Sequence, residues 1–340
     1  MTSFVGKNSI QNLSDILKNE NVQKALIFTG KKSYEVIKHI IESELKGIEF
    51  QYYSDFSTNP KKEEIDIAIE KLKDDFDIIL AIGGGSVIDF AKAFRFYTKQ
   101  IKLVAIPTTC GTGSEATQFA VIYIDGVKNS LDNSSILPNY SIIDSQFVQN
   151  NPKYLKACTS MDAYCQAIES YWAVGANDES KKYALKAIEL CKENLALYVK
   201  SVDLKYSENM AKASNLAGCA INISRTTAAH ALSYKITSEY NIPHGHAVAL
   251  SMADLFLANS KADNENVKKI IQDILNVLNL KSPQDFVNYW YNLMDEIGLE
   301  KSFLRLGITD KQLIIKSVNL DRLKNNPKDI KDDLKNFWQL

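Results

Sequence analysis

Imidazole and carboxylate side chains, which are common ligands of transition metals, gather in the second half of this sequence. Three of the four histidines, His230, His244 and His246, fall within 17 residues. A divalent site built on imidazoles also needs a carboxylate, and Asp162 is the candidate. Four positions later, Gln166 shares its helical face and offers a neutral carbonyl oxygen, a weaker ligand than imidazole. These residues predict a divalent metal site.

Two polar loops suit the binding of phosphate groups. The first consists of Gly83, Gly84, Gly85 and Ser86. Glycines between a strand and a helix let backbone N–H groups approach a pyrophosphate, which the positive helix N-terminus also attracts. The hydroxyl groups of the second loop come from Thr108, Thr109, Thr112 and Ser114. Together the loops predict a dinucleotide site, although their spacing is not G-x-G-x-x-G; close packing alone is the alternative explanation of the glycines.

Strand-like and helix-like segments alternate over residues 1–150 and place both loops. Apolar runs predict strands over 24–29, 47–53, 77–82 and 103–106, and amphipathic periods predict helices over 33–44 and 61–74. Such alternation predicts right-handed βαβ units and a mainly parallel, Rossmann-like sheet, with ligands bound at the strand ends. A further strand over 120–124 enters a tight turn at Asp125 and Gly126.

Helical periods replace this alternation after Asn150, where Asn151 and Pro152 break the pattern. The clearest helical segments are 180–197, 208–223, 264–278 and 283–297. We therefore predict an α/β dinucleotide-binding domain over residues 1–150. An all-α domain follows over residues 151–340 and carries the candidate metal ligands.

The composition narrows the class of protein. The 340 residues are 45% hydrophobic and 24% charged, as in globular proteins. A formal charge of −1 argues against nucleic acid as a partner. No apolar run reaches the length of a membrane span, and the N-terminus lacks a signal-peptide pattern. The five cysteines form no CxxC pair, so we expect reduced thiols and a cytoplasmic location.

Four segments occur in one order over nearly the whole chain: GGGSVIDFAKA (83–93), PTTCGTGSEAT (107–117), the helix 162–169 and the segment 230–244. Together they resemble the iron-containing (group III) alcohol dehydrogenase family. The resemblance implies a dehydroquinate synthase-like architecture, an active site in the cleft between the two domains, and a homodimer. It also implies an Asp, a His four residues later and two His spaced 14 apart as metal ligands. Asp162, His230 and His244 match three of these positions, and Gln166 stands at the fourth.

Gln166 at a ligand position leaves two interpretations open. Either two imidazoles and a carboxylate, helped by the Gln166 carbonyl, still bind Fe²⁺ or Zn²⁺, or the cation is absent and histidines alone polarise the substrate. We expect a bound metal, because two imidazoles and a carboxylate give three coordination points. His246 replaces the missing imidazole, shuttles a proton or lies at the surface. Tyr234, one turn after His230, either donates a hydrogen bond to the developing alkoxide or serves packing.

The resemblance also bears on the cofactor. Family members that prefer NAD place an acidic residue after the strand that corresponds to 26–29, where it meets the adenine ribose. This chain has Gly30, Lys31, Lys32 and Ser33 there instead. A small residue leaves room, and the lysines and hydroxyl suit a 2′-phosphate, so we expect NADPH rather than NADH. The alternative is that both lysines form a solvated helix start. Lys128 matches a lysine that the family places near the cofactor.

Arg225 and Thr226, which lie shortly before His230, are candidates for binding the substrate. Arg225 precedes His230 by five residues, and Thr226 follows Arg225. An arginine with hydroxyl neighbours near a metal suits a phosphonate or carboxylate better than an alkyl chain, although an ion pair between helices is an alternative. With the segment 165–172, these residues resemble the phosphonoacetaldehyde reductase branch. That resemblance implies NAD(P)H-dependent, metal-assisted reduction of a small anionic aldehyde, such as phosphonoacetaldehyde, to the alcohol.

The sequence leaves three alternative functions open. The chain is a generic short-chain alcohol dehydrogenase of the same family, a dehydroquinate synthase-like cyclase, or a nucleotide-binding homologue that lost its activity when Gln166 arose. The segment PTTCGTGSEAT and the 14-residue spacing from His230 to His244 favour a dehydrogenase. Net consumption of NADPH separates it from a cyclase, which regenerates its cofactor in every turnover.

Overall fold

The computed structural model describes residues 1–338, except for the side chains of Lys32 and Ser33. Two residues predicted to bind the cofactor therefore lie outside the described side chains. The chain divides into two compact units, Met1–Asn150 and Asn151–Leu340. None of the helices over the described residues combines the length and the apolar character that a bilayer crossing requires.

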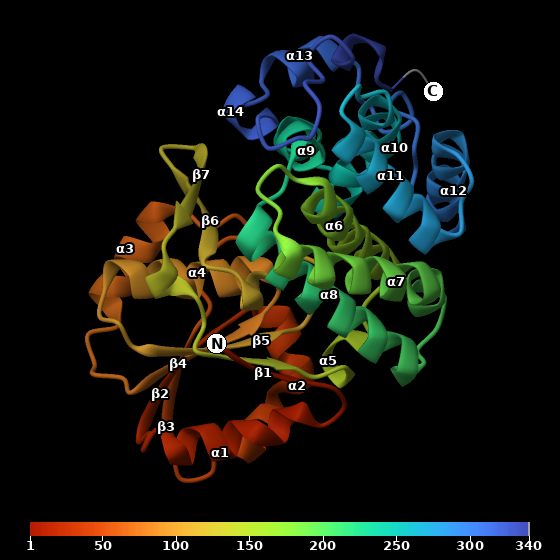
Figure 1. The fold of residues 1–340 in the computed structure, drawn as a ribbon. Coiled ribbons are helices and arrows are strands. Elements are labelled where there is room, and N and C mark those ends of the chain that lie inside the picture. Colours follow the sequence, from red (N-terminus) through yellow and green to blue (C-terminus); the bar gives the residue numbers. More distant parts are fainter. Residues whose placement is uncertain (339–340) are drawn as a thin grey trace. The chain divides into compact units, whose positions relative to one another are not determined.

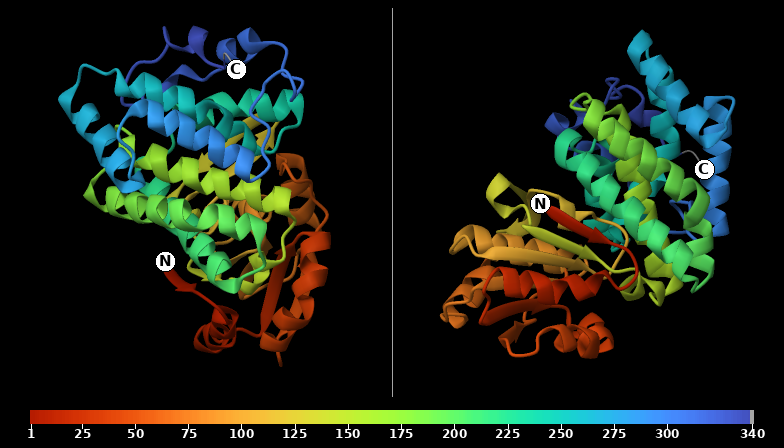
Figure 2. Two further views of the ribbon diagram at one scale, coloured as in Figure 1. Left: turned by 90° about the vertical axis from the view of Figure 1, so that its right-hand side faces the viewer. Right: turned by 60° about the horizontal axis from the view of Figure 1, so that its bottom comes forward.

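The first unit is built on a parallel sheet, which Figures 1 and 2 show in red to yellow. Its strands are β1 (Thr2–Val5), β2 (Lys24–Thr29), β3 (Glu49–Tyr53), β4 (Ile78–Gly83), β5 (Lys102–Pro107) and β8 (Tyr140–Ile143). Their order across the sheet is β1-β8-β5-β4-β2-β3, and every neighbouring pair runs parallel. The predicted mainly parallel α/β fold is confirmed.

Helices pack on both faces of this sheet. They are α1 (Asn12–Asn19), α2 (Lys31–Glu44), α3 (Lys62–Lys71), α4 (Gly85–Tyr97) and the short α5 (Gln146–Gln149). Successive side chains of a strand point to opposite faces, so a strand covered on both sides is apolar throughout. Ala25 and Ile27 of β2 lie in one core with α1 and α2, whereas Leu26 and Phe28 lie in a second core with α3 and α4.

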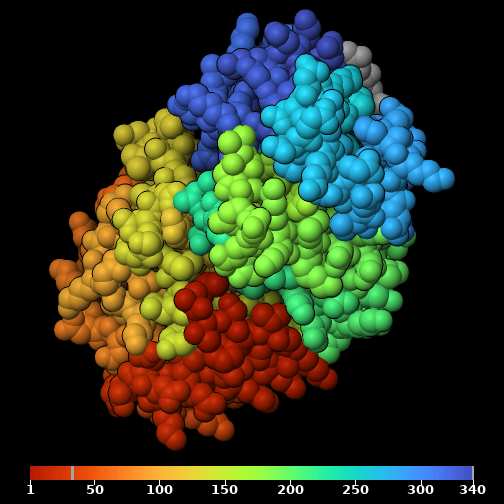
Figure 3. All heavy atoms as spheres, viewed as in Figure 1, coloured from red at the N-terminus to blue at the C-terminus, as the bar shows by residue number. Residues whose placement is uncertain are grey.

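Two short strands and a hairpin complete the unit. Sequence periodicity did not indicate β1 and β8, because each has four residues and β1 is largely exposed. The N-terminal residues, in red, lie at the surface in Figure 3. The predicted strand over 120–124 is β6 (Phe119–Ile124), and it pairs antiparallel with β7 (Val127–Asp132). Asp125 and Gly126 join them with φ angles of 51° and 75°, as a tight hairpin turn requires.

The second unit is helical over the described residues 151–338, which confirms the predicted all-α fold. Its helices are α6 (Lys153–Trp172), α7 (Asp178–Lys200), α8 (Leu204–Ser224), α9 (Ala228–Tyr240), α10 (His244–Ser260), α11 (Glu265–Leu278), α12 (Pro283–Glu296), α13 (Lys311–Lys316) and α14 (Leu320–Leu323). The helix α10 is buried almost throughout. It therefore has no polar face, and amphipathic periodicity does not reveal it.

Helix starts in this unit show which residues fix the local geometry. Asn177, Asn264 and Ser282 cap α7, α11 and α12, because their side chains accept hydrogen bonds from N–H groups of the first turn. Thr227, which precedes α9, makes no such bond with its side chain. The first turn of α9 is capped instead by a residue of another helix, Glu169.

Candidate functional site

Asp162, His230 and His244 come together inside the second unit. They belong to α6, α9 and the first turn of α10, respectively. One ligand atom from each lies within 4.8 Å of the others. Asp162 and His230 are buried, and Asp162 Oδ1 lies 3.2 Å from His230 Nε2. Three helices thus place two imidazoles and a carboxylate around one point, as a divalent cation requires.

Glu169, two turns after Asp162 on the same face of α6, holds His230 in place. Its side chain is fully buried, and Oε2 is hydrogen-bonded to His230 Nδ1. When the ring is neutral, a proton on Nδ1 leaves the lone pair of Nε2 beside Asp162. Glu169 Oε1 accepts hydrogen bonds from the backbone N–H groups of Thr227 at 3.1 Å and Ala229 at 2.8 Å. One carboxylate therefore caps α9 and orients its imidazole.

The two carboxylates change the acid–base properties of the cluster. Burial by itself lowers the pKa of His230, but the charge of Glu169 and the hydrogen bonds with Asp162 and Glu169 outweigh it and raise the pKa to about 9. Burial by itself raises the pKa of Asp162, yet the hydrogen bond from His230 and the charges of both histidines hold it below its ordinary value. The cluster therefore favours positive charge between its carboxylates, which a divalent cation also supplies.

Gln166 is buried beside the cluster, one turn after Asp162. Its Nε2 donates a hydrogen bond of 3.2 Å to Asp162 Oδ1. In this orientation the amide nitrogen faces Asp162, whereas the sequence predicted the carbonyl oxygen as a ligand. Rotation of the amide would exchange the two atoms, so the prediction for Gln166 stays a prediction.

Gly245 determines how closely α10 approaches α6. A Cβ atom at this position would lie 1.9 Å from the carbonyl oxygen of Cys158 and 2.8 Å from Cβ of Asp162. Neither separation is possible between real atoms, so only glycine fits here. Because Gly245 follows His244 directly, the close approach of the two backbones is what brings His244 near Asp162.

This donor set fits a divalent transition metal. Imidazole nitrogens and carboxylate oxygens bind Zn²⁺ and Fe²⁺, and three protein ligands leave a coordination position for a substrate. Glu169 already orients His230, and Nδ1 of His244 lies 3.3 Å from the Ser233 hydroxyl oxygen. We therefore expect Nε2 of each ring to be the ligating atom. Asp162, His230 and His244 are the residues that would hold the ion.

His246, predicted as a proton shuttle, has structural contacts at both ring nitrogens. Its Nδ1 lies 3.1 Å from the hydroxyl oxygen of Tyr154, and its Nε2 lies 2.6 Å from the carbonyl oxygen of Glu300. The side chain is buried, and burial lowers its pKa. This arrangement does not support a proton shuttle or a metal ligand at His246; it joins the start of α6 to the segment after α12.

Tyr234, the other residue predicted as catalytic, lies beside the metal cluster. Its ring stacks on the ring of His244, with centroids 6.1 Å apart and planes inclined by 15°. Its hydroxyl oxygen accepts a hydrogen bond of 2.8 Å from Arg322. The hydroxyl is thus turned toward a cation of α14, and the packing role of the ring is evident.

Arg225 and Thr226, predicted to bind substrate, form the turn between α8 and α9. The Arg225 guanidinium donates a hydrogen bond to the carbonyl oxygen of Asn222 in its own helix. Its backbone has φ 64° and ψ 172°, a combination that is ordinarily restricted to glycine. The carbonyl oxygen of Thr226 accepts a hydrogen bond of 3.0 Å from Asn325. The described contacts of both residues stabilise the turn, and none of them indicates a substrate site.

In the first unit, the two polar loops meet where β4 ends and α4 begins. A Cβ atom on Gly85 would lie 2.6 Å from the side chain of Thr112, and one on Gly84 would lie 3.5 Å from Thr109 Oγ1. The second loop therefore rests directly against the glycine turn. Both loops flank the N-terminus of α4, where a pyrophosphate would meet backbone N–H groups and the positive end of the helix dipole.

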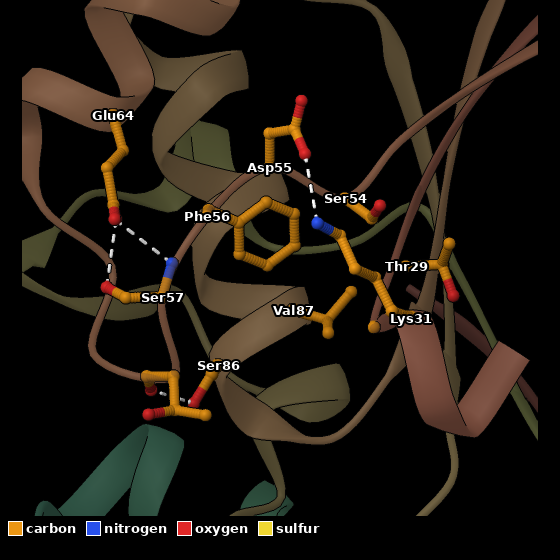
Figure 4. A pocket seen from close by; sticks show the side chains of 11 residues that line it. Thr29, Lys31, Ser54, Asp55, Phe56, Ser57, Glu64, Ser86 and Val87 are labelled. Atoms are coloured by element: carbon orange, nitrogen blue, oxygen red, sulfur yellow. Dashed lines mark hydrogen bonds and ion pairs between the residues drawn. The ribbon is translucent and has the colours of Figure 1, made fainter.

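A pocket of about 580 Å³ opens beside this turn (Figure 4). Its lining residues are Thr29, Gly30, Lys31, Ser54, Asp55, Phe56, Ser57, Thr58, Glu64, Ser86 and Val87. Gly30 follows β2, as the sequence predicted, but an acidic residue is nonetheless present. Asp55, two residues after the neighbouring strand β3, forms an ion pair with Lys31 at 3.2 Å. The 2′-phosphate pocket expected at the end of β2 thus contains a carboxylate.

Lys92 of α4 anchors the second polar loop from inside. Its Nζ is fully buried and donates hydrogen bonds to Ser114 Oγ at 2.9 Å and Thr117 Oγ1 at 3.0 Å. Ser114 Oγ donates in turn to Asp89 Oδ1 at 2.5 Å. Burial lowers the pKa of Lys92 to about 8 and raises that of Asp89. Ser114, predicted to bind the cofactor, belongs to this buried network.

Two further predicted cofactor residues lie near the same loop. Thr108 is buried, and its backbone N–H donates a hydrogen bond of 3.0 Å to the carbonyl oxygen of Gly83. Lys128 lies on β7, close enough to Asp89 for its charge to oppose the effect of burial on the pKa of that carboxyl. Neither residue lines the pocket of Figure 4.

Three residues of these sites were missing from the sequence prediction. Glu169 lies seven positions after Asp162, so the period of one helical face would have revealed it. Asp55 follows a predicted strand, at the end where ligands bind in parallel sheets. Arg322 had no comparable signal, because α14 has only four residues and the contact with Tyr234 depends on tertiary structure.

Comparison with known proteins gives matches over both units. A family model described as iron-containing alcohol dehydrogenase matches residues 2–145. A second, described as the C-terminal part of the Fe-containing alcohol dehydrogenase family, matches residues 156–333. These two ranges cover most of the described chain and include every residue of the metal cluster.

Individual relatives show how far the similarity reaches. The NADPH-dependent butanol dehydrogenase of Clostridium saccharobutylicum is 29% identical over 325 residues, which cover 87% of this chain and 81% of that protein. The aldehyde-alcohol dehydrogenase of Streptococcus pneumoniae is 28% identical over 91% of this chain, which spans 41% of the length of that relative. Among solved structures, sulfoacetaldehyde reductase from Bifidobacterium kashiwanohense in complex with NAD⁺ is 26% identical in sequence to this chain. The two structures superpose with a TM-score of 0.90 over 98% of this chain and 94% of that one.

Proposed function

Because the chain belongs to the iron-containing alcohol dehydrogenase family, we propose that it catalyses the NAD(P)H-dependent, metal-assisted reduction of a small aldehyde to the alcohol. The observation that carries this proposal is the convergence of Asp162, His230 and His244 on one point. In the balanced reaction, the aldehyde, NAD(P)H and one proton give the alcohol and NAD(P)⁺, so the carbonyl group gains a hydride at carbon and a proton at oxygen.

The residues of the chain bind and orient the two groups that the reaction needs. Asp162, His230 and His244 would hold a divalent cation, and Glu169 keeps the Nε2 atom of His230 directed at it. The glycine turn at 83–85 and the threonines that pack on it would hold the pyrophosphate. When bound, the cation supplies Lewis-acid polarisation of the carbonyl group, and the dihydronicotinamide supplies the reducing electrons.

NADPH is the cofactor that we propose. Gly30 offers no carboxylate to a 2′-phosphate, and Lys31 lines the adjacent pocket. The butanol dehydrogenase relative is named as NADPH-dependent, whereas the sulfoacetaldehyde reductase structure is a complex with NAD⁺. Because Asp55 pairs with Lys31 at 3.2 Å, a 2′-phosphate must compete for that lysine. We therefore propose a modest preference for NADPH over NADH.

The substrate that we propose is a small aldehyde with an anionic group, such as phosphonoacetaldehyde. The support is the similarity to a sulfoacetaldehyde reductase, together with Arg322, which donates a hydrogen bond to Tyr234 beside the metal cluster. A neutral short-chain aldehyde is the second candidate, and the similarity to a butanol dehydrogenase favours it. On the family resemblance alone we also propose a homodimer, which sedimentation of the purified protein would test.

Metal analysis combined with a screen of NADPH oxidation tests the proposed activity. We expect about one Fe²⁺ or Zn²⁺ per chain and net NADPH oxidation with at least one of phosphonoacetaldehyde, sulfoacetaldehyde and propanal. Asp162→Asn should lose both the metal and the activity, while Glu265→Gln, an exposed carboxylate of α11, should keep both.

Two results would contradict the proposal in different ways. Tight NADPH binding without reduction of any aldehyde would identify an inactive nucleotide-binding homologue. Conversion of a sugar phosphate with no net change in NADPH would identify a cyclase.

A further inference from the structure

Arg322 is a half-buried cation for which the structure provides no acidic partner within residues 1–338. Its guanidinium donates one hydrogen bond of 2.8 Å, to the neutral hydroxyl of Tyr234, and lies 5.2 Å from the centre of that ring. The neighbouring carboxylate of Asp321 pairs with Lys324 instead, at 2.7 Å. A guanidinium carries five N–H donors, so most of the donors of Arg322 have no protein acceptor here.

A single aromatic ring separates this guanidinium from the metal cluster. Tyr234 contacts Arg322 through its hydroxyl and ring, and the same ring stacks on His244, with centroids 6.1 Å apart. Tyr234 also lies one helical turn after His230. The cation is therefore placed a short distance from the point on which the metal ligands converge.

The backbone that carries Arg322 is held firmly by hydrogen bonds. The side-chain amide of Asn325 donates to the carbonyl oxygens of Ser224 at 2.9 Å and Thr226 at 3.0 Å. It also accepts a hydrogen bond of 3.0 Å from the backbone N–H of Gly175. The segment after α14 is thus fixed to two turns of the helical unit, and Tyr234 fixes the guanidinium. A preorganised cation loses little entropy when it binds an anion.

Arg225, the other arginine near the cluster, is placed differently. Its guanidinium donates to the carbonyl oxygen of Asn222 and so closes the end of its own helix, α8. This hydrogen bond directs the Arg225 side chain toward the end of α8. Of the two arginines, Arg322 is the one that faces the Tyr234 ring, which stacks on His244 of the metal cluster.

We propose that Arg322 binds the anionic group of the substrate, an aldehyde that carries a phosphonate or sulfonate one or two carbons from its carbonyl. This inference rests on the proposed reduction of a small anionic aldehyde and names the residue that selects it. Arginine suits this task, because its planar fork donates two parallel hydrogen bonds to tetrahedral oxyanions. Tyr234, whose ring stacks on His244, acts as a positioning residue that holds the fork near the metal cluster.

The test compares charged and uncharged aldehydes in matched variants. The kcat/KM values for phosphonoacetaldehyde, sulfoacetaldehyde and propanal are measured for the wild type, Arg322→Gln, Arg322→Lys and Arg225→Gln. Arg305→Gln is the control for loss of an exposed positive charge, since Arg305 is 78% exposed. Metal content and thermal midpoint are recorded for each variant, and calorimetry gives the Kd of 2-hydroxyethylphosphonate, the product of phosphonoacetaldehyde reduction.

We expect Arg322→Gln to lower kcat/KM for both anionic aldehydes about 50-fold, mainly through KM, and to weaken 2-hydroxyethylphosphonate binding by a similar factor. Turnover of propanal should change less than threefold, with metal content unchanged. Arg322→Lys should recover part of the loss, because it restores the charge without the fork. Arg225→Gln and Arg305→Gln should retain the preference for the anionic aldehydes.

Failures of the two proposals are distinguishable. If the wild type does not prefer either anionic aldehyde over propanal, the proposed anionic substrate is wrong, and the role of Arg322 falls with it. If the wild type shows the preference and Arg322→Gln keeps it, only the assignment of Arg322 is overturned. Equal loss of all three aldehydes, with loss of metal, would show that Arg322 supports the fold of the site instead.

Discussion

The carboxylate of Glu169 decides which nitrogen of His230 carries a proton. Because Oε2 bonds to Nδ1, a neutral ring keeps its lone pair on Nε2, beside Asp162. In Glu169→Gln, the amide oxygen can still cap α9, but the amide NH₂ would face Nδ1 and move the ring proton to Nε2. We expect the affinity for Zn²⁺ to fall by about 10-fold to 100-fold. Titration of the metal-free protein with Zn²⁺ measures this change.

A matched carboxylate away from the cluster is the control for this variant. Glu265→Gln removes a charge that pairs with Lys268 on the exposed face of α11, and it should bind Zn²⁺ as the wild type does. If Glu169→Gln also kept the wild-type affinity, Glu169 would serve only as the cap of α9.

Gln166 stands where the family resemblance implies a histidine ligand. It is buried one turn after Asp162, and its amide reaches Asp162 Oδ1 at 3.2 Å. An imidazole nitrogen is a stronger ligand for transition metals than an amide oxygen. Gln166→His should therefore raise the Zn²⁺ affinity at least about tenfold in the same titration, while Gln272→His on the exposed face of α11 should not. An unchanged affinity would mean that this side chain does not reach the ion.

The ends of β2 and β3 place Asp55 and Lys31 next to each other, so Asp55 and a 2′-phosphate would compete for the same lysine. Asp55 after β3 pairs with Lys31 after β2, and both side chains are largely exposed, at 62% and 71%. A 2′-phosphate bound there would have to displace Asp55 from Lys31 and would be repelled by the charge of that carboxylate. In Asp55→Asn, the Kd for NADPH should fall by about threefold to tenfold, whereas the Kd for NADH should not fall. Nucleotide fluorescence at low and high salt measures both constants.

The control for this variant is another exposed ion pair of the same unit. Asp75→Asn removes the partner of Lys99, outside the pocket, and should leave both nucleotide affinities unchanged. The increase in NADPH affinity caused by Asp55→Asn should be smaller at high salt, because screening weakens interactions between exposed charges. A parallel change for NADPH and NADH would place the ion pair away from the 2′ position.

The alternation of strands and helices, and the loops at the ends of β4 and β5, could be predicted because they depend on local periodicity and on glycine. The cluster of candidate metal ligands, Asp162, His230 and His244, could be predicted from residue type and from resemblance to a family. The partners of His246 could not, because Tyr154 and Glu300 come from segments distant in sequence. The same holds for Arg225, whose side chain turns back onto its own helix only in the folded chain.

At the scale of the whole molecule, the two candidate sites draw on different units. Asp162, His230 and His244 all belong to Asn151–Leu340, whereas the pocket of Figure 4 belongs to Met1–Asn150. Chelation of the metal should therefore speed hydrogen exchange in α9 and α10, and NADPH should slow it around the turn at 83–87. A ligand at a thousandfold excess over its Kd stabilises the native state by about 4 kcal/mol. Mass spectrometry of exchanged peptides resolves the two effects.

Three outcomes of the hydrogen-exchange experiment would contradict the two site assignments. If a chelator left the exchange of α9 and α10 unchanged in protein that metal analysis shows to be loaded, the ion would bind elsewhere. If NADPH protected no peptide of the first unit, the dinucleotide site would be misplaced. A change confined to the termini would count against both assignments.

Gly245 sets the spacing of the backbones that carry His244 and Asp162. The main chains of α10 and α6 touch at this point, where any Cβ would collide with the carbonyl oxygen of Cys158. Zn²⁺ needs its ligands at about 2.0 to 2.2 Å. A methyl group at position 245 would push the two helices apart and move His244 away from Asp162. A hydrogen atom in place of that methyl group therefore keeps both side chains within reach of the same cation.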